Sequence, residues 1–318
     1  MAPPTPQGDP AHGPIAAIVG PTGSGKTELS LAVARAIPIE ILVADSRQVY
    51  RGMDVGTAKP DAAARASVPH HLLDLATPGE PFSVADWAAA ARLLLPAVRA
   101  RRRLPVVVGG SGLYLAALLD GYAFGPAPDP DGRSRLQEEL ASAGIVALAD
   151  RLRAVDPTAA ARTDLRNPRR VTRALERAAS APHGAVPPGT HPWSGPTRLL
   201  GLSRPTEVLN RRIDERAAWL FANGLLEEVR GLLEAGHDPH RRPLTSHGYG
   251  EAARHLAGEW SLEEAVAVTA RRTRQYAKRQ RTWFRRDVRI VWLEAGDEPG
   301  DAPELTAAAI RVLGELRA

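Results

Sequence analysis

Residues 20–27, GPTGSGKT, constrain the fold more than any other segment of this 318-residue chain. They match the pattern G-x-x-x-x-G-K-S/T, in which glycines let backbone N–H groups surround a phosphate. An apolar run, residues 15–20, precedes the segment and a helical pattern follows it. This strand–loop–helix order predicts a phosphate-binding loop in which Lys26 supplies a positive charge and the Thr27 hydroxyl can bind Mg²⁺.

Two further apolar runs are typical of buried parallel strands, and each ends in a turn. Residues 40–45 (EILVAD) end at Asp45, and residues 104–110 (LPVVVGG) lead into a second glycine-rich turn that carries Ser111. Helical patterns alternate with these runs, which predicts an α/β fold with a P-loop-type parallel sheet flanked by helices. Because parallel strands end at one edge of a sheet, we expect Asp45 and Ser111 beside the phosphate loop.

Asp45 is the candidate for acid–base chemistry at that edge. Its carboxylate could bind Mg²⁺ through water or accept a proton from a bound nucleophile. A simple turn-initiating aspartate is the alternative interpretation.

Proline and glycine punctuate the chain and suggest its domain organisation. Pro/Gly-rich segments occupy residues 125–132 and 181–196, with charged helical patterns between them. We therefore expect a disordered N-terminal tail (1–13), a catalytic α/β core (14–120 and 197–318) and a small all-helical insertion domain (121–196).

Composition excludes several classes of protein. The chain has no apolar run of membrane-spanning length, and its first residues lack the charged and apolar regions of a signal peptide. It contains no cysteine, which excludes a disulfide scaffold, a cysteine-based zinc site and a thiol nucleophile. We expect a cytoplasmic enzyme without membrane contact. No helical pattern offers an exposed apolar face, so we expect a monomer.

Arginine is concentrated in two places, although the net charge is only +5. The segment DLRNPRRVTRALE falls in the predicted insertion, and ARRTRQYAKRQRTWFRRD falls in a late helix. In the late helix, five cations at positions 271, 274, 278, 281 and 285 are spaced to lie on one face. Two basic helices near a phosphate site favour a nucleic-acid backbone as partner. A solvated cationic face or a GC-biased composition is the alternative.

Six segments occur in the order found in the tRNA dimethylallyltransferases, also called tRNA isopentenyltransferases. They are GPTGSGKT, DSRQVYRGMDVGTAKP, PHHLLDLATPGEPFS, PVVVGGSGLY, RNPRRVTRALE and KRQRTWFR. The chain resembles this family, in its bacterial form, over almost all of its predicted folded length. The resemblance implies transfer of the dimethylallyl group of dimethylallyl diphosphate to N6 of the adenine at tRNA position 37, just 3′ of the anticodon, with release of diphosphate.

The resemblance also implies roles for individual residues. Asp45 resembles the family's general base, with Ser111 beside it as a further catalytic residue. The residues implied to hold the diphosphate, with Mg²⁺ at Thr27, are Gly20, Pro21, Thr22, Gly23, Ser24, Gly25, Lys26, Thr27 and Arg216. The residues implied to contact the tRNA anticodon stem-loop are Asp45, Ser46, Arg47, Gln48, Ser111, Arg133, Arg169, Arg170, Val171, Thr172, Arg173, Lys278, Arg279, Gln280, Arg281, Thr282, Trp283, Phe284 and Arg285.

Two positions depart from the family pattern. Ser111 stands where the family usually has threonine, which preserves the hydroxyl. His247 precedes Gly248 and Tyr249 where the family usually has an apolar residue.

Three other functions would use parts of the same sequence. A small-molecule kinase would explain the phosphate loop and Asp45 but not the two arginine-rich helices. A nucleotide-switched RNA-binding protein would explain those helices but has no use for the DSRQVY stretch beside the loop. A transferase that prenylates free adenylate would share the loop chemistry but would not need a basic insertion.

Overall fold

The computed structural model describes residues 12–122, 129–180 and 192–316, which form two compact units. The chain passes from the first unit to the second between Asp120 and Gly121, and returns between His191 and Pro192. The first unit contains the sheet and the second is all helical.

The first unit is built on a six-stranded, fully parallel sheet with the strand order β3-β2-β4-β1-β5-β6. The strands are β1 (Ile15–Val19), β2 (Ile39–Ala44), β3 (His70–His71), β4 (Leu104–Gly109), β5 (Thr197–Ser203) and β6 (Ile290–Glu294). Strand β1 lies between β4 and β5, so the loop that follows it emerges near the middle of the sheet. The predicted α/β class with a flanked parallel sheet is confirmed.

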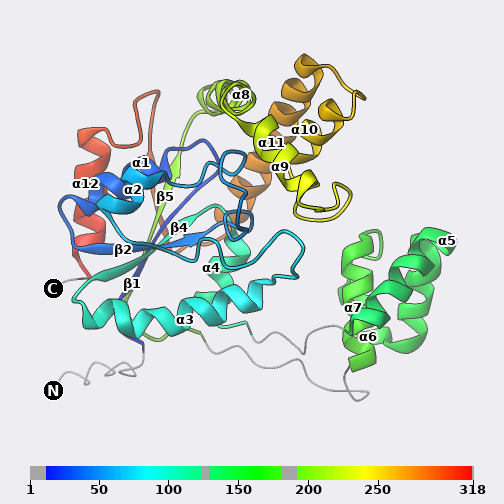
Figure 1. Cartoon of the computed structure of the whole chain (residues 1–318). Coiled ribbons are helices and arrows are strands. Elements are labelled where there is room, and N and C mark those ends of the chain that lie inside the picture. The colour runs from blue at the N-terminus through cyan, green and yellow to red at the C-terminus, as the bar shows by residue number, and fades with distance from the viewer. Residues whose placement is uncertain (1–11, 123–128, 181–191, 317–318) are drawn as a thin grey trace, which may run out of the picture. The chain divides into compact units, whose positions relative to one another are not determined.

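Helices cover both faces of this sheet, as Figure 1 shows. Helices α1 (Lys26–Ala34), α2 (Ala62–Ser67) and α12 (Pro303–Gly314) lie on one side, and α3 (Val84–Ala100) and α4 (Gly112–Leu119) lie on the other. Every residue of β1 and β2 is buried, as expected for strands covered on two faces. Helix α3 runs through Pro96 as one element.

A second group of helices belongs to the same unit. It comprises α8 (Thr206–Ala222), α9 (Leu225–Glu234), α10 (Tyr249–Leu256) and α11 (Leu262–Phe284). Helix α11 packs on α8 and α10 and also reaches α4, which connects this group to the sheet layer. Gly224, which has a φ of 101°, separates α8 from α9.

The second unit contains α5 (Pro130–Val155), α6 (Pro157–Arg162) and α7 (Pro168–Ser180). Leucines of α5 and residues of α6 and α7 form its own apolar core, which includes Leu148, Val171 and Leu175. Because it has its own apolar core, this unit has the organisation of a small helical domain.

Two boundaries differ from the sequence prediction. Residues 1–11 of the predicted tail lie outside the described residues, but His12 and Gly13 are packed: the His12 ring stacks on Trp193, and the Trp193 indole donates to the Gly13 carbonyl. Residues 192–196, predicted to belong to the insertion, lie in the first unit. Trp193 in this segment makes the contacts with His12 and Gly13.

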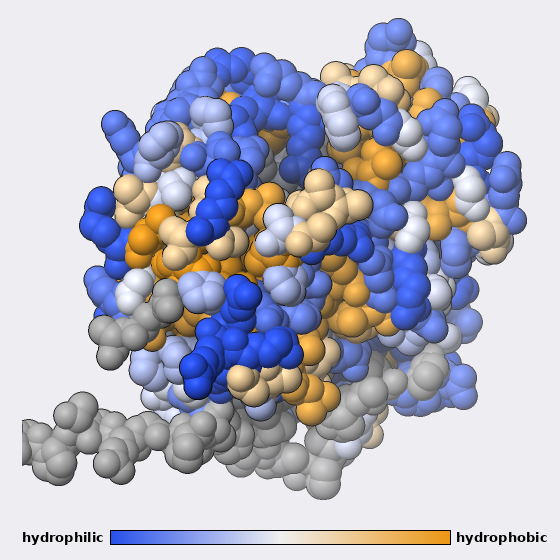
Figure 2. Space-filling model, turned by 60° about the vertical axis from the view of Figure 1, so that its left-hand side comes forward, coloured by the Kyte–Doolittle hydropathy of each residue, from blue (hydrophilic) through white to orange (hydrophobic). Residues whose placement is uncertain are grey.

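Within the part of the chain that the structure describes, no helix is both long and apolar enough to cross a bilayer. On the face drawn in Figure 2, hydrophilic residues surround the apolar patches.

Candidate active site

The phosphate loop between β1 and α1 has a backbone that only glycine adopts easily. Gly20 has a φ of 150°, and a Cβ there would lie 2.5 Å from the Leu202 carbonyl oxygen. Gly25 has a φ of 98° and lies directly before α1. These conformations start the helix with its first N–H groups at the loop, which is the arrangement that binds anions.

Side chains from three other elements hold the loop in this form. The Arg204 guanidinium, just after β5, donates to the Ser24 carbonyl at 2.9 Å. Arg212 of α8 donates to the Gly23 carbonyl at 3.0 Å. The Gln280 side chain of α11 accepts from the Thr22 N–H at 2.9 Å. The loop is therefore preorganised by residues far away in the sequence.

Cationic side chains converge beside the loop. Burial, followed by the nearby Arg216 charge, lowers the pKa of Lys26 to about 8, although Asp45 opposes the change. Burial and then Arg47 also lower the pKa of Arg216. Positive charges that destabilise one another in this way mark a site that an anion would neutralise.

Asp45 and Ser111 meet at the ends of adjacent strands. The Ser111 N–H donates to the Ala44 carbonyl at 3.2 Å, and the Ser46 N–H donates to Ser111 Oγ at 3.3 Å. The Asp45 carboxylate accepts from the Arg47 N–H at 2.9 Å and stays partly exposed. The predicted juxtaposition of Asp45, Ser111 and Lys26 is therefore present in the structure, because β2 and β1 both flank β4.

The solved proteins and families that resemble this chain point to one assignment. The model of the family described as "IPP transferase" matches residues 48–287. The chain belongs to the IPP transferase family. A second family model, described as "Isopentenyl transferase", matches residues 13–74.

Curated relatives agree over most of their length. The chain is 46% identical to the tRNA dimethylallyltransferase of Syntrophobacter fumaroxidans, over 95% of this chain and 89% of that protein. It is 45% identical to the tRNA dimethylallyltransferase of Salinispora tropica, over 95% and 93% respectively. The predicted family resemblance is thus confirmed.

Solved structures show the same fold. The tRNA isopentenylpyrophosphate transferase of Bacillus halodurans has a TM-score of 0.69 and 38% identity, covering 96% of this chain and 98% of that one. A eukaryotic dimethylallyltransferase acting on tRNA has a TM-score of 0.80 and 25% identity, covering 96% and 79%.

Tyr276 lies in the site, although the sequence motifs predict no role in the site for it. Its ring lies 5.6 Å from the His247 ring and 5.8 Å from the Arg47 guanidinium. Burial, and then the Asp45 carboxylate, raise the pKa of Tyr276, while hydrogen bonding with Ser111 and Gln280 opposes the increase. The Tyr276 hydroxyl therefore belongs to the Asp45–Ser111 group. Tyr276 lies one helical turn before Gln280, and this spacing could have placed both residues on the same face of α11.

The segment after Asp45 is also fixed from a distance. Glu228 of α9 accepts from the backbone N–H groups of Asp54, Val55 and Gly56 at 2.7, 2.7 and 3.1 Å. The Thr57 carbonyl that follows accepts from Gln48 at 3.0 Å and faces Arg216 at 3.5 Å. Gln48, expected to contact tRNA, has its amide group bound to the protein backbone in this conformation.

Three residues that the sequence predicts as tRNA contacts have buried side chains. Val171 lies in the core of the helical unit, and Phe284 and Gln280 are covered within the first unit. Their side chains offer no surface to an RNA backbone.

In the helical unit, two of the predicted arginines share one carboxylate. Arg133 and Arg173 bind Glu176 at 2.7 and 3.1 Å. Burial alone would raise the pKa of Glu176, but these hydrogen bonds outweigh it and leave that pKa lowered. Arg169 and Arg170, at the start of α7, are exposed, and Thr172 is partly exposed.

The basic face predicted for α11 is not uniform. Arg274 forms an ion pair with Asp214 of α8, and Arg281 donates to the Thr206 hydroxyl at 2.9 Å. These two therefore lie in the seam with α8. The exposed members of the predicted contact set on α11 and its C-cap are Lys278, Arg279, Thr282, Trp283 and Arg285.

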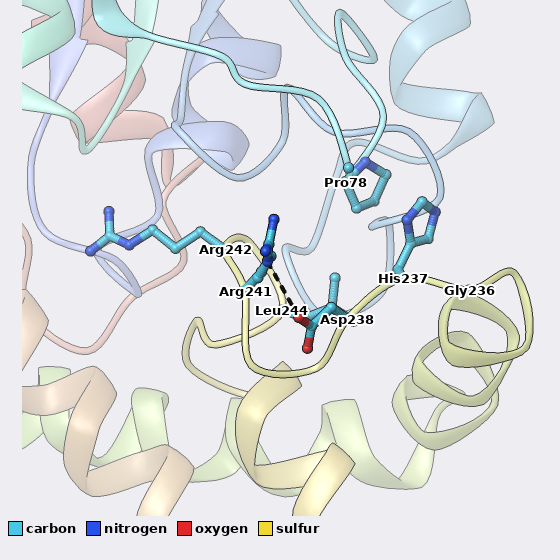
Figure 3. Close-up of a pocket in the computed structure, with 8 residues that line it drawn as sticks. Pro78, Gly236, His237, Asp238, Arg241, Arg242 and Leu244 are labelled. Atoms are coloured by element: carbon cyan, nitrogen blue, oxygen red, sulfur yellow. Dashed lines mark ion pairs between the residues drawn. The ribbon is translucent and has the colours of Figure 1, made fainter. Parts of the chain in front are cut away.

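A separate cavity of about 270 Å³ lies away from these residues (Figure 3). Pro78 and Gly79 form one wall, and the loop from Gly236 to Leu244 forms the other. Asp238 neutralises Arg241 at 3.4 Å across part of the lining. None of the residues predicted for the site lines this cavity, so it is not the place of the phosphate chemistry.

Proposed function

We propose that this IPP transferase moves the dimethylallyl group of dimethylallyl diphosphate to N6 of the adenine at tRNA position 37. The new bond joins N6 to the allylic carbon, the bond from that carbon to the diphosphate oxygen breaks, and a proton leaves N6. The names of the relatives, tRNA dimethylallyltransferases, support this substrate pair.

One observation carries the proposal: the cationic phosphate loop lies beside a carboxylate and a hydroxyl. Lys26, Arg216 and the loop N–H groups would bind the diphosphate and stabilise its charge as it departs. Asp45, at the adjacent strand end, would receive the N6 proton. An adenine N6 lone pair is delocalised into the ring and is a poor nucleophile. The reaction therefore needs both a stabilised leaving group and a base for the N6 proton.

Mg²⁺ fits this set of groups. The donors near the loop are the Thr27 hydroxyl, exposed in the first turn of α1, and the Asp45 carboxylate, and both are the hard oxygen ligands that Mg²⁺ prefers. Among the described residues, no cluster of three or more histidine, aspartate or glutamate side chains could hold a metal alone. The diphosphate oxygens would therefore complete the coordination, and the ion would neutralise leaving-group charge.

The exposed cations would hold the tRNA. Lys278, Arg279 and Arg285 on the α11 segment and Arg169 and Arg170 on α7 suit a polyanionic backbone. The target base is stacked within the anticodon loop, so it must turn out of the stack to reach Asp45. Because tRNA is a cytoplasmic substrate, we also propose a cytoplasmic enzyme, acting as a monomer.

A direct test uses product mass. The protein is incubated with dimethylallyl diphosphate, Mg²⁺ and either unmodified tRNA or AMP, and the nucleosides are then analysed by mass spectrometry. We expect an isopentenyl mass increase on adenosine from tRNA and none on AMP. Modification of AMP alone would assign the chain to adenylate prenylation, and no modification would refute prenyl transfer.

A second test addresses Asp45. Asp45→Asn keeps the size of the side chain but removes the base. We expect tRNA affinity within about twofold of wild type and a transfer rate lower by about 10² to 10⁴. An equal loss of tRNA binding would instead make Asp45 a structural residue.

A further inference from the structure

Gln280 of α11 bridges the two glycine-rich turns of the site. Its Oε1 accepts from the Thr22 N–H and its Nε2 donates to the Gly110 carbonyl, both at 2.9 Å. Thr22 lies in the phosphate loop, and Gly110 directly precedes Ser111. Because one partner is a donor and the other an acceptor, the orientation of the amide group is fixed.

The fit around this bridge is close. A Cβ at Gly110 would lie 2.1 Å from Gln280 Nε2, so only glycine allows the amide to approach. One turn farther along α11, Trp283 packs against Gly112 in the same way, with a Cβ there only 2.1 Å from its ring. One turn earlier, Tyr276 reaches Ser111. The inner face of α11 therefore follows the turn around Ser111 from end to end.

The surface of α11 that faces solvent carries different residues. Lys278 and Arg279 precede Gln280 and are exposed, whereas Gln280 itself is 7% exposed. Because the Gln280 side chain is buried and both ends of its amide are bound within the protein, it is not placed as an RNA contact.

We propose that Gln280 is a positioning residue that fixes the phosphate loop relative to the Asp45–Ser111 edge, where the adenine would bind. The inference rests on the proposed prenyl transfer. That reaction requires the allylic carbon to lie between its leaving oxygen and the attacking N6. The phosphate loop would hold the diphosphate that carries the leaving oxygen, and the Asp45–Ser111 edge would receive the adenine N6. The Gln280 bridge between the two turns therefore sets the distance between the leaving oxygen and N6. A displacement of about 1 Å costs roughly 100-fold in rate.

Two substitutions test the bridge. Gln280→Met has similar length and no amide, so it removes both hydrogen bonds. Gln280→Glu retains an acceptor for the Thr22 N–H but, when ionised, has no proton for the Gly110 carbonyl. Gln275→Met, the same change at an exposed glutamine of α11 that has no proposed role in the site, is the matched control. For each variant, the dissociation constants of inorganic pyrophosphate and of tRNA are measured, together with the single-turnover transfer rate at saturating substrates.

We expect both Gln280 variants to bind tRNA within about twofold of wild type, to bind pyrophosphate about fivefold or more weakly, and to transfer about 100-fold more slowly. Gln275→Met should leave tRNA binding, pyrophosphate binding and the saturated rate within about twofold of wild type, because its side chain is exposed. As pH falls, the rate of Gln280→Glu relative to wild type should rise, because a protonated carboxyl group donates to Gly110 as the amide does. Gln280→Met should show no such recovery.

The contrary results are distinct. Loss of tRNA affinity with a normal saturated rate would make Gln280 an RNA contact and overturn the proposal, as would wild-type rates in both variants. If Gln280→Met does not fold, the pH-dependent recovery of Gln280→Glu decides alone. Failure of the wild-type protein to prenylate tRNA would refute the proposed function instead, without reference to Gln280.

Discussion

The Tyr249 hydroxyl donates a 2.5 Å hydrogen bond to Glu228, the same carboxylate that accepts from three successive backbone N–H groups of the segment before Thr57. Tyr249 is fully buried, and its ring lies where a Cβ at Gly56 would clash, at 2.5 Å. The pair therefore holds the segment whose Thr57 carbonyl faces Arg216 and Gln48. The Glu228 carboxylate on α9 is thus linked to Arg216, a predicted diphosphate-binding residue, through the backbone of residues 54–57.

We predict that Glu228→Ala destabilises the protein by about 2 to 4 kcal/mol, because several charge-assisted hydrogen bonds are lost at once. Pyrophosphate affinity should fall as well, since Arg216 loses its fixed neighbour. Urea unfolding and calorimetric titration measure the two effects. Glu227→Ala is the control: its side chain is exposed and its ion pair with Arg230 is long, at 4.0 Å, so we expect a change below about 0.5 kcal/mol. Equal effects from both substitutions would contradict the role of Glu228.

The low pKa of Lys26, about 8, predicts how donor binding depends on pH. In the free protein, Lys26 loses its proton as pH rises through this value, whereas a bound diphosphate would raise its pKa. Pyrophosphate affinity should therefore fall above pH of about 8, by up to about tenfold per pH unit. In Lys26→Arg the guanidinium stays protonated, so this part of the decline should disappear. Calorimetric titration of both proteins measures this difference, because protonation of pyrophosphate itself affects the two proteins equally. If the pH profiles of wild type and Lys26→Arg were parallel, Lys26 would not be the group that titrates near pH 8.

The sequence predicts the parts of the site that depend on local order and sheet topology. The glycines of the phosphate loop, Asp45 and Ser111 each follow a buried strand, and parallel strands end at one edge. Their meeting therefore follows from recognising three strands. Arg216 was identified only through the family resemblance, since its helix has no pattern that indicates a site.

The supporting residues could not be predicted because their contacts are distant in sequence. Gln280 binds Thr22, 258 residues away, and Glu228 binds Asp54, 174 residues away. The pattern of α11 also carries charge on several sides, so spacing alone does not reveal its inner face. Spacing placed Arg274 and Arg281 on an open cationic face, whereas α8 covers part of it.

His247, which departs from the family pattern, predicts a component of acid sensitivity. Burial, and then the charges of Arg47, Arg272 and Arg279, lower the pKa of His247 to about 4. The unfolded chain binds this proton near pH 6.5, so the stability conferred by the neutral ring is complete above that value. It is lost as pH falls from about 6.5 to 4, by at most about 3 kcal/mol.

His247→Val should therefore lose less stability than wild type over this pH range, as measured by urea unfolding at several pH values. His240→Asn, at an exposed histidine, should retain the wild-type pH dependence. Unchanged acid sensitivity in His247→Val would show that the ring does not titrate in this way.

The two environments of cations on the α11 segment predict different effects on RNA binding. Arg285 is exposed and forms no ion pair within the described part of the chain, whereas Asp214 neutralises Arg274. Each phosphate contact that is lost should lower the slope of log affinity against log salt by about 0.7 to 0.9. Arg285→Ala should therefore weaken tRNA binding and reduce this slope by about one contact, as measured by fluorescence anisotropy between about 50 and 200 mM salt. Arg274→Ala should leave the slope almost unchanged, because the charge it removes is already paired. If Arg274→Ala reduced the slope as much as Arg285→Ala, the ion pair with Asp214 would have to open for tRNA, and the original single-face arrangement would describe the bound state better.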